Sequence, residues 1–152
     1  MLKKVGNKID YITFRFGTIS GVSKGMRFHT AVNKFCLDAS LNRNISVYKT
    51  ALNQFRPYLS LQDAFKVFKF TIENDLFKND IFNALSENCT VNDILNKIKK
   101  YKRDIKVKFV SSPIMNQLSY HVDKRKLNKE GLFLKNRIEI DIKETLKLLK
   151  NI

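Results

Sequence analysis

One residue pair has the spacing of a general base, Tyr120 and Lys124. Four residues apart on one helix, a lysine ammonium lowers the pKa of a tyrosine, and the phenolate can then accept a proton. Here Tyr120 ends an extended segment whereas Lys124 belongs to the next expected helix, so the two side chains need not share a face. In a lysine-rich chain a two-residue pattern arises readily by chance. We therefore assign no catalytic residue.

Three of the five glycines lie in residues 17–26, where the backbone can turn sharply or approach a ligand closely. Their spacing is neither the G-x-G-x-x-G that follows a strand in dinucleotide-binding folds nor a Walker phosphate loop. The chain therefore has no dinucleotide fingerprint of its own.

The cysteines and histidines do not form a ligand pattern. Cys36 and Cys89 are far apart and lack a Cys-x-x-Cys or Cys/His spacing, and His29 and His121 are isolated. We expect two partly buried thiols in a reducing compartment and no metal site.

The net charge of +15 raises the question of nucleic-acid binding, which depends on phosphate neutralisation and counterion release. Lysine far outnumbers arginine and asparagine is abundant, as expected of a low-GC coding bias. The basic clusters 97–103 and 124–126 fall on the outer faces of expected helices, where charge is usually solvated. Solvated charge is favoured; a nucleic-acid interface would require the two clusters to form one continuous patch.

The length of 152 residues suits one domain, residues 1–152, with a substantial core. No apolar run approaches the roughly 20 residues that cross a bilayer. Residues 1–8 lack the apolar core of a signal peptide. We expect a cytoplasmic protein with no membrane partner.

The elements that would position these residues alternate between strands and helices. A buried strand is expected over 10–16, and a helix over 28–41 follows the glycine-rich segment. Further extended segments are expected over 45–48, 57–59, 81–85 and 106–110.

Cap signals place the remaining helices. Ser60-x-x-Asp63 resembles a capping box that opens a helix through residue 74, with the apolar stripe Leu61, Ala64, Phe65, Phe68 and Ile72. Thr90 caps another helix, a short helix runs from Asp123 to Gly131, and the last begins near Glu139. This alternation predicts an α/β layered fold.

Residues 15–21, Arg-Phe-Gly-Thr-Ile-Ser-Gly, resemble the strand-to-loop turn of the extended short-chain dehydrogenase/reductase enzymes, the NAD-dependent nucleotide-sugar epimerases and dehydratases. Met26-Arg27-Phe28 with Asn33, the strand 45–48, and the block 54–64 around Arg56-Pro57-Tyr58 follow in the order that the family has. The closing segment 119–146 also matches, although Leu118 stands where many members have a phosphate-binding arginine.

The resemblance implies roles for individual residues. Phe16 and the backbone after Thr18, at Ile19, would flank the nicotinamide of NAD, while the Thr18 side chain would face the sugar. Asn33 would contact the nucleotide diphosphate, and Tyr48 belongs to the strand laid along the nucleotide base.

The phosphate contacts follow from the same resemblance. Arg56 would hold a phosphate bidentately. Either Asn116 or Gln117 serves in place of the missing arginine, or the site is reshaped. Singly, Arg56 could instead be a surface arginine, Asn33 a polar helix residue and Tyr48 a core or interface aromatic.

In that family about half of the protein precedes the turn, whereas here fourteen residues do. The resemblance therefore implies the C-terminal portion of an extended short-chain dehydrogenase: the last Rossmann-sheet strand or strands and a small α/β substrate-binding lobe, without the dinucleotide-binding part. The implied partner is a nucleotide-diphosphate sugar. NAD would bind only if an N-terminal Rossmann half, for example a separately encoded one, completed the site, and the chain alone would have no activity.

Two rival functions stay open at this point, a basic nucleic-acid-binding domain and a protein-interaction module. In the latter, the surface that the missing half leaves bare would bind another protein. An apolar exposed face around residues 11–16 would favour the interaction module or the split enzyme.

Overall fold

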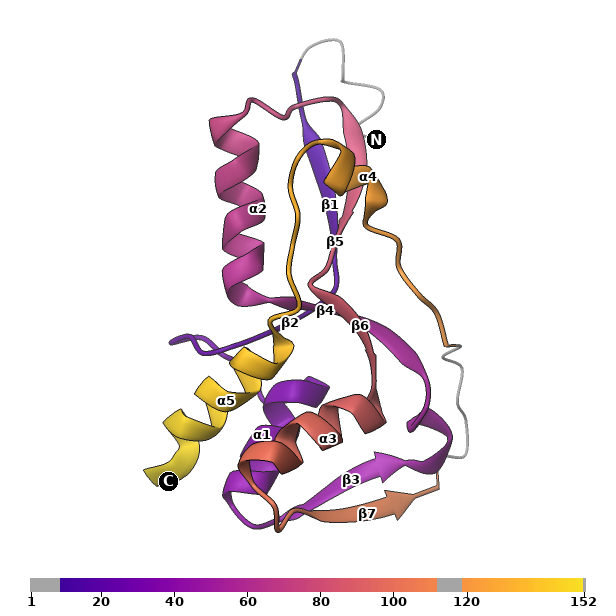
Figure 1. Ribbon diagram of the computed structural model, residues 1–152, viewed down its shortest axis with the longest axis vertical. Coiled ribbons are helices and arrows are strands. Elements are labelled where there is room, and N and C mark those ends of the chain that lie inside the picture. Colours follow the sequence, from indigo (N-terminus) through magenta and orange to yellow (C-terminus); the bar gives the residue numbers. More distant parts are fainter. Residues whose placement is uncertain (1–8, 112–118, 152) are drawn as a thin grey trace.

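The computed structural model describes residues 9–111 and 119–151, and its elements alternate between strand and helix (Figure 1). In chain order they are β1 (Ile12–Phe16), β2 (Thr18–Ser20), α1 (Ala31–Ser40), β3 (Asn44–Tyr48), η2 (Lys49–Ala51), β4 (Phe55–Ser60), α2 (Leu61–Glu73), β5 (Asp80–Ala84), β6 (Glu87–Thr90), α3 (Val91–Tyr101), β7 (Lys106–Val110), α4 (Arg125–Lys129), α5 (Ile138–Leu148) and η3 (Leu149–Asn151). The expected α/β class is confirmed. A single domain over residues 1–152 stays a prediction.

The strands form three small sheets. β1 and β5 make a parallel pair, and β3 and β7 make another. Between them lies a three-stranded sheet in the order β2-β4-β6, in which β4 runs parallel to β2 and antiparallel to β6. β4 therefore connects the two ends of the molecule (Figure 1).

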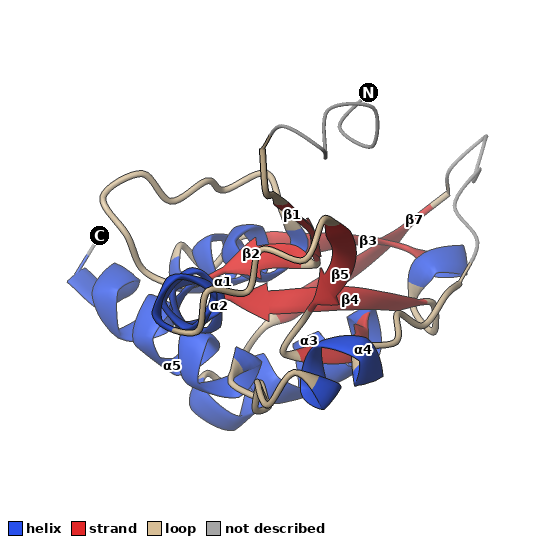
Figure 2. Cartoon of the chain, turned by 90° about the horizontal axis from the view of Figure 1, so that it is seen from above, coloured by secondary structure: helices blue, strands red, loops and turns tan. Residues whose placement is uncertain are grey.

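Two apolar clusters hold these sheets and helices together. The larger joins α1, α3 and α5 to the β3–β7 pair and includes Val32, Ile45, Ile94 and Ile142. The smaller one joins α2 to the β1–β5 pair, and leucines from α4 and the segment after it complete it. In both views α2 lies to the left of β1 and β5 (Figure 1 and Figure 2).

Gly17 is where β1 ends and the chain turns into β2. Its N–H donates to the Ala84 carbonyl at 3.0 Å, and a Cβ added here would lie 2.9 Å from the carbonyl carbon of Pro57. Only glycine allows the backbone to pass β4 this closely. The turn places Thr18 beside Tyr58 on β4.

The cap predictions have opposite outcomes. At α3 the Thr90 hydroxyl accepts from the Asp93 N–H at 3.0 Å and the Asp93 carboxylate accepts from the Thr90 N–H at 2.9 Å, which confirms the cap. At α2 the expected capping box is wrong, because the Ser60 side chain makes no cap hydrogen bond. Its hydroxyl donates to Asp141 instead.

Three other element predictions need correction. The glycine-rich segment contains strand β2, and Glu87–Thr90 forms strand β6; both depend on pairing with β4, which no local pattern reveals. Helix α1 begins at Ala31 rather than at residue 28.

Within the described residues no helix has the length and apolar character needed to cross a membrane. The cytoplasmic location stays a prediction.

Candidate functional site

A cavity of about 410 Å³ opens between β2, the loop after it and the start of α1. Thr18 and Asn33, both expected to bind substrate, line it together with Arg27. The fold thus unites two predicted site residues that are fifteen positions apart in the sequence.

Asn33 shapes this cavity through its own amide. Its Nδ2 donates to the Arg27 carbonyl at 3.0 Å, and its Oδ1 accepts from the Gly21 N–H at 3.4 Å. The side chain is buried, so it fastens the loop to α1. Its predicted diphosphate contact stays a prediction, and the structure adds a positioning role.

Beneath the loop lies a buried carboxylate that the sequence did not reveal. Asp141 of α5 accepts from the Ser20 hydroxyl at 2.9 Å and from the Ser60 hydroxyl at 2.8 Å. Burial raises the pKa of Asp141 to about 6, which the two hydroxyl donors oppose and the charge of Glu144 supports. A Cβ on Gly21 would lie 3.4 Å from its Oδ1, so the group lies directly below the cavity wall.

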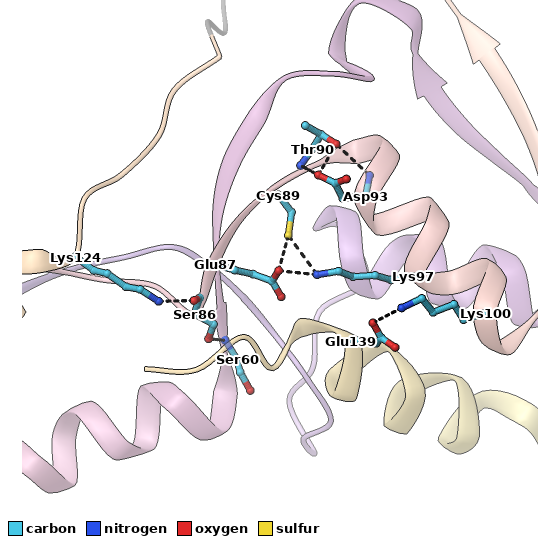
Figure 3. Close-up of polar contacts among 10 residues, drawn as sticks. All are labelled: Ser60, Ser86, Glu87, Cys89, Thr90, Asp93, Lys97, Lys100, Lys124 and Glu139. Atoms are coloured by element: carbon cyan, nitrogen blue, oxygen red, sulfur yellow. Dashed lines mark hydrogen bonds and ion pairs between the residues drawn. The ribbon is translucent and has the colours of Figure 1, made fainter. Parts of the chain in front are cut away.

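A second buried carboxylate continues this network into α2. The Ser86 hydroxyl donates to Asp63 at 2.6 Å and accepts from the Ser60 N–H at 2.9 Å, the contact drawn in Figure 3. The network therefore ties β2, β4, α2 and α5 into one frame below the cavity. Contacts across up to 121 residues left no local signal in the sequence.

Arg56 lies in a different place from Thr18 and Asn33. Its Nη1 donates to the Phe55 carbonyl at 2.7 Å and its Nη2 to Gln54 Oε1 at 3.0 Å. Its guanidinium carbon lies 5.1 Å from the centre of the Tyr120 ring, in cation–π contact. The guanidinium thus lies over an aromatic ring and is hydrogen-bonded to two neighbouring residues.

The segment that returns from residue 119 is bound to β4 next to Arg56. Ser119 Oγ accepts from the Phe55 N–H at 3.0 Å, and the rings of Phe55 and His121 lie 4.1 Å apart. The segment that begins at Ser119 therefore lies beside Arg56. Asn116 and Gln117 lie outside the described residues.

Tyr48 and Phe16 occupy two further surroundings. Tyr48 ends β3 with half of its side chain exposed, and it does not line the Thr18–Asn33 cavity. Phe16 borders a hollow of about 370 Å³ with Arg15, Asn83 and Tyr120. The predicted site residues thus fall into separate groups rather than into one pocket.

Phe16 also lines an apolar groove of about 730 Å³ with Ile19, Phe65 and Phe68. Phe16 and Ile19 are the two residues that the resemblance places against the nicotinamide. Here they line the groove together with residues of α2. The groove offers apolar surface, whereas a dinucleotide needs in addition a loop of backbone N–H groups for its phosphates.

Tyr120 and Lys124 do not act on one another. Lys124 Nζ donates to the carbonyls of Ser86 at 2.6 Å and Leu134 at 3.0 Å, as Figure 3 shows for Ser86. Tyr120 instead lies against Arg56. The two side chains thus have separate partners, and the interpretation of the four-residue spacing as a coincidence stays a prediction.

The two thiols are free and buried, as expected. Cys89 Sγ lies 3.1 Å from Glu87 Oε2, and Lys97 Nζ lies 2.6 Å from the same oxygen (Figure 3). Burial raises the pKa of Cys89 to about 12, and burial raises the pKa of Cys36 to about 12 as well. Neither thiol is suited to be a nucleophile at neutral pH. Within the described residues no group of three or more His, Cys, Asp or Glu side chains could hold a metal ion.

Comparison with solved structures places this fold. The UDP-glucuronic acid 4-epimerase from Bacillus cereus, in complex with UDP-glucuronic acid and NAD, matches 99% of this chain with a TM-score of 0.83 at 13% identity. The UDP-N-acetylglucosamine 4-epimerase from Methanobrevibacter ruminantium matches 99% with a TM-score of 0.79 at 20% identity. The UDP-glucose 4-epimerase from Thermus thermophilus matches 95% with a TM-score of 0.77 at 17% identity.

In each case the match covers about half of the solved chain: 49% of the first, 50% of the second and 50% of the third. This chain therefore spans about half the length of the structures that it resembles. No protein-family model matches the sequence. The expected α/β fold is confirmed, and it is the fold of about half of a UDP-sugar epimerase structure.

Proposed function

We propose that this chain forms the nucleotide-sugar wall of a NAD-dependent sugar epimerase or dehydratase site. The observation that carries the proposal is the cavity beside β2, where Thr18 and Asn33 meet within the fold of the UDP-sugar epimerases. A nucleotide-diphosphate sugar offers both hydroxyl groups and a double negative charge. Thr18 would bond the sugar, whereas Asn33 and Arg56 would contact the diphosphate.

The placement of Arg56 supports a phosphate role. Contact with the Tyr120 ring and bonds to Gln54 and the Phe55 carbonyl hold the guanidinium in one orientation. A preorganised guanidinium loses less entropy on binding a phosphate than a mobile one. Asn116 or Gln117, in the segment that leads to Tyr120, would complete the phosphate contacts, and Tyr48 would lie along the nucleotide base.

This chain's residues do not fit a whole dinucleotide. Its sequence lacks the glycine-rich phosphate loop, and Phe16 and Ile19 provide only apolar surface for one ring. We propose that NAD and the proton acceptor come from a second, Rossmann-type half and that the chain alone is inactive. The cytoplasm is the compartment that we propose.

Replacing Arg56 tests the proposal. Titration of UDP-glucuronic acid and UDP-N-acetylglucosamine by calorimetry should give binding to the wild type that Arg56→Ala weakens by about tenfold or more, because a charge-assisted bond to phosphate contributes about 1.5–3 kcal/mol.

The matched control is Arg43→Ala, which removes an exposed arginine just after α1. It lowers the net charge equally and should leave the affinity unchanged. Binding that Arg56→Ala and Arg43→Ala weaken to the same degree would exclude a phosphate site at Arg56, and no binding of either sugar nucleotide would reject the proposed function.

The rival nucleic-acid function loses its expected geometry. Residues 97–103 lie on and after α3 and residues 124–126 at the start of α4, toward opposite ends of the molecule (Figure 1). Lys97 and Lys100 are paired with Glu87 and Glu139. The two basic clusters therefore do not form the continuous patch that this function requires.

A further inference from the structure

The β1–β5 sheet, like the β3–β7 sheet, consists of two parallel strands among the described residues. Parallel sheets occur almost only where helices cover both faces. Among the described residues β5 is the one strand paired with β1. A sheet ordinarily has about four to six strands, so two strands leave an edge at which further strands could pair.

Backbone geometry shows which groups face the open edge of β1. The Tyr11 carbonyl accepts from the Asn79 N–H at 2.8 Å, and the Gly17 N–H donates to the Ala84 carbonyl at 3.0 Å, both toward β5. Both polar groups of one residue in a parallel strand point the same way and alternate along the chain. The N–H and C=O groups of Phe14 and Phe16 therefore face away from β5, as a template for another strand.

Helix α2 carries a second apolar stripe that its own fold does not bury. Val67 and Ala64 pack inward, whereas Phe65, Phe68 and Ile72 are 67%, 51% and 72% exposed. Together with Leu61 these positions form a stripe at helical spacing. The large side chains thus face outward while the small ones fill the core, the reverse of what a finished surface helix shows.

The stripe and the open edge adjoin one another. The Phe68 ring lies 5.5 Å from the ring of Phe16 and 6.3 Å from that of Phe14, both in edge-to-face contact. The groove between them includes Ile19 and is rimmed by Lys66 and Lys69. A strand placed beside β1 would therefore lie against the exposed face of α2.

We propose that the β1 edge and the α2 stripe form one docking seam for a separately encoded, acidic α/β polypeptide. It would add a parallel strand beside β1 and place apolar side chains against Phe65 and Phe68. The solved structures of this fold are about twice as long as this chain, which matches an occupant of similar size. The inference rests on the proposed function in one respect, that the partner carries the dinucleotide loop.

A second copy of this chain is a poorer occupant. Two identical β1 edges related by a two-fold axis would pair antiparallel, against the direction of this sheet. A net charge of +15 on each copy would also oppose the contact, whereas it attracts an acidic partner.

Photo-crosslinking from the stripe tests the seam. Phe65→Cys, coupled to a maleimide photo-crosslinker, labels selectively because burial raises the pKa of Cys36 and of Cys89 to about 12. The labelled chain is added to extract of the source cells, and adducts are identified by mass spectrometry. The expected adduct is a separate polypeptide that contains a strand followed by G-x-G-x-x-G.

Phe109→Cys is the matched control, because Phe109 is an exposed phenylalanine on β7 at the other end of the molecule. It should not give this adduct, and adding Phe68→Lys to the Phe65→Cys chain should abolish it while the circular dichroism spectrum stays unchanged. Three results would contradict the proposed seam. They are an adduct with a second copy of this chain, the same protein adducts from positions 65 and 109, and no adduct from position 65. Sugar-nucleotide titration is scored separately, so an adduct without sugar-nucleotide binding would reject the proposed function and leave the seam intact.

Discussion

Asp141 places a carboxyl group in the interior, where the Ser20 and Ser60 hydroxyls donate to it. Hydroxyl bonds offset part of the desolvation that an ionised carboxylate undergoes on burial. The remaining cost appears as the pKa of about 6. The folded state is therefore more stable relative to the unfolded chain when this group is protonated.

Stability should consequently depend on pH through Asp141. Its pKa rises from 3.8 in the unfolded chain to about 6 in the folded one, so the folded state binds the extra proton between these values. The contribution is fully present below pH 3.8 and is lost as the pH rises through 6. We expect this contribution to the free energy of unfolding to amount to about 2–3 kcal/mol. Asp141→Asn should remove it, and with it this part of the pH dependence of the free energy of unfolding.

Chemical denaturation at several pH values gives the free energy of unfolding of the wild type and of Asp141→Asn. The dependence of this free energy on pH is then compared between the two proteins. Asp104→Asn, which changes an exposed carboxylate, is the control and should follow the wild type. Parallel profiles for wild type and Asp141→Asn would contradict the assignment.

At the scale of elements, local signals succeeded where the partners are close in sequence. Thr90 and Asp93 are three residues apart, and their reciprocal bonds are those that the sequence predicts. Ser60 and Asp63 have the same spacing, yet each bonds a group brought by another element, Asp141 and Ser86. A capping pattern competes with tertiary partners, and at α2 the tertiary partners prevail.

The cap of α3 therefore provides an element-scale prediction. Thr90→Ala removes the acceptor of the Asp93 N–H and should lower the free energy of unfolding by about 1–2 kcal/mol. Thr50→Ala, a threonine within the short η2 turn, is the control. Equal losses in urea denaturation for both variants would show that the cap contributes nothing specific.

At the scale of the whole molecule, excess charge and one bare apolar face characterise the chain. Eight ion pairs are recorded among the described residues, and most involve exposed lysines. Exposed pairs of this kind contribute little. Self-repulsion of the +15 charge is therefore the larger electrostatic term, and an acidic partner would relieve it.

Salt should stabilise the isolated chain. Raising NaCl from about 20 mM to about 300 mM shortens the Debye length and should raise the Tm by a few degrees, because repulsion is screened more than the short ion pairs are. Thermal melts with sucrose at equal osmolality separate screening from solvent exclusion. A Tm that falls with salt would mean that the ion pairs dominate.

The sequence by itself determined the elements that depend on neighbours: the strand that ends before Gly17, the α3 cap and the order of motifs that indicated half of a larger fold. The helical periodicity of apolar residues identified the stripe of α2, but it did not predict that Phe65, Phe68 and Ile72 are exposed to solvent. Burial is a property of what surrounds a helix, and the sequence of the helix does not contain it.

Only the tertiary structure decided the remainder. It separated Arg56 from Thr18 and Asn33, joined Ser20 and Ser60 to Asp141 and placed Phe68 against the open edge of β1. These contacts join residues up to 121 positions apart. They depend on how sheets and helices pack, which local propensity and spacing do not specify.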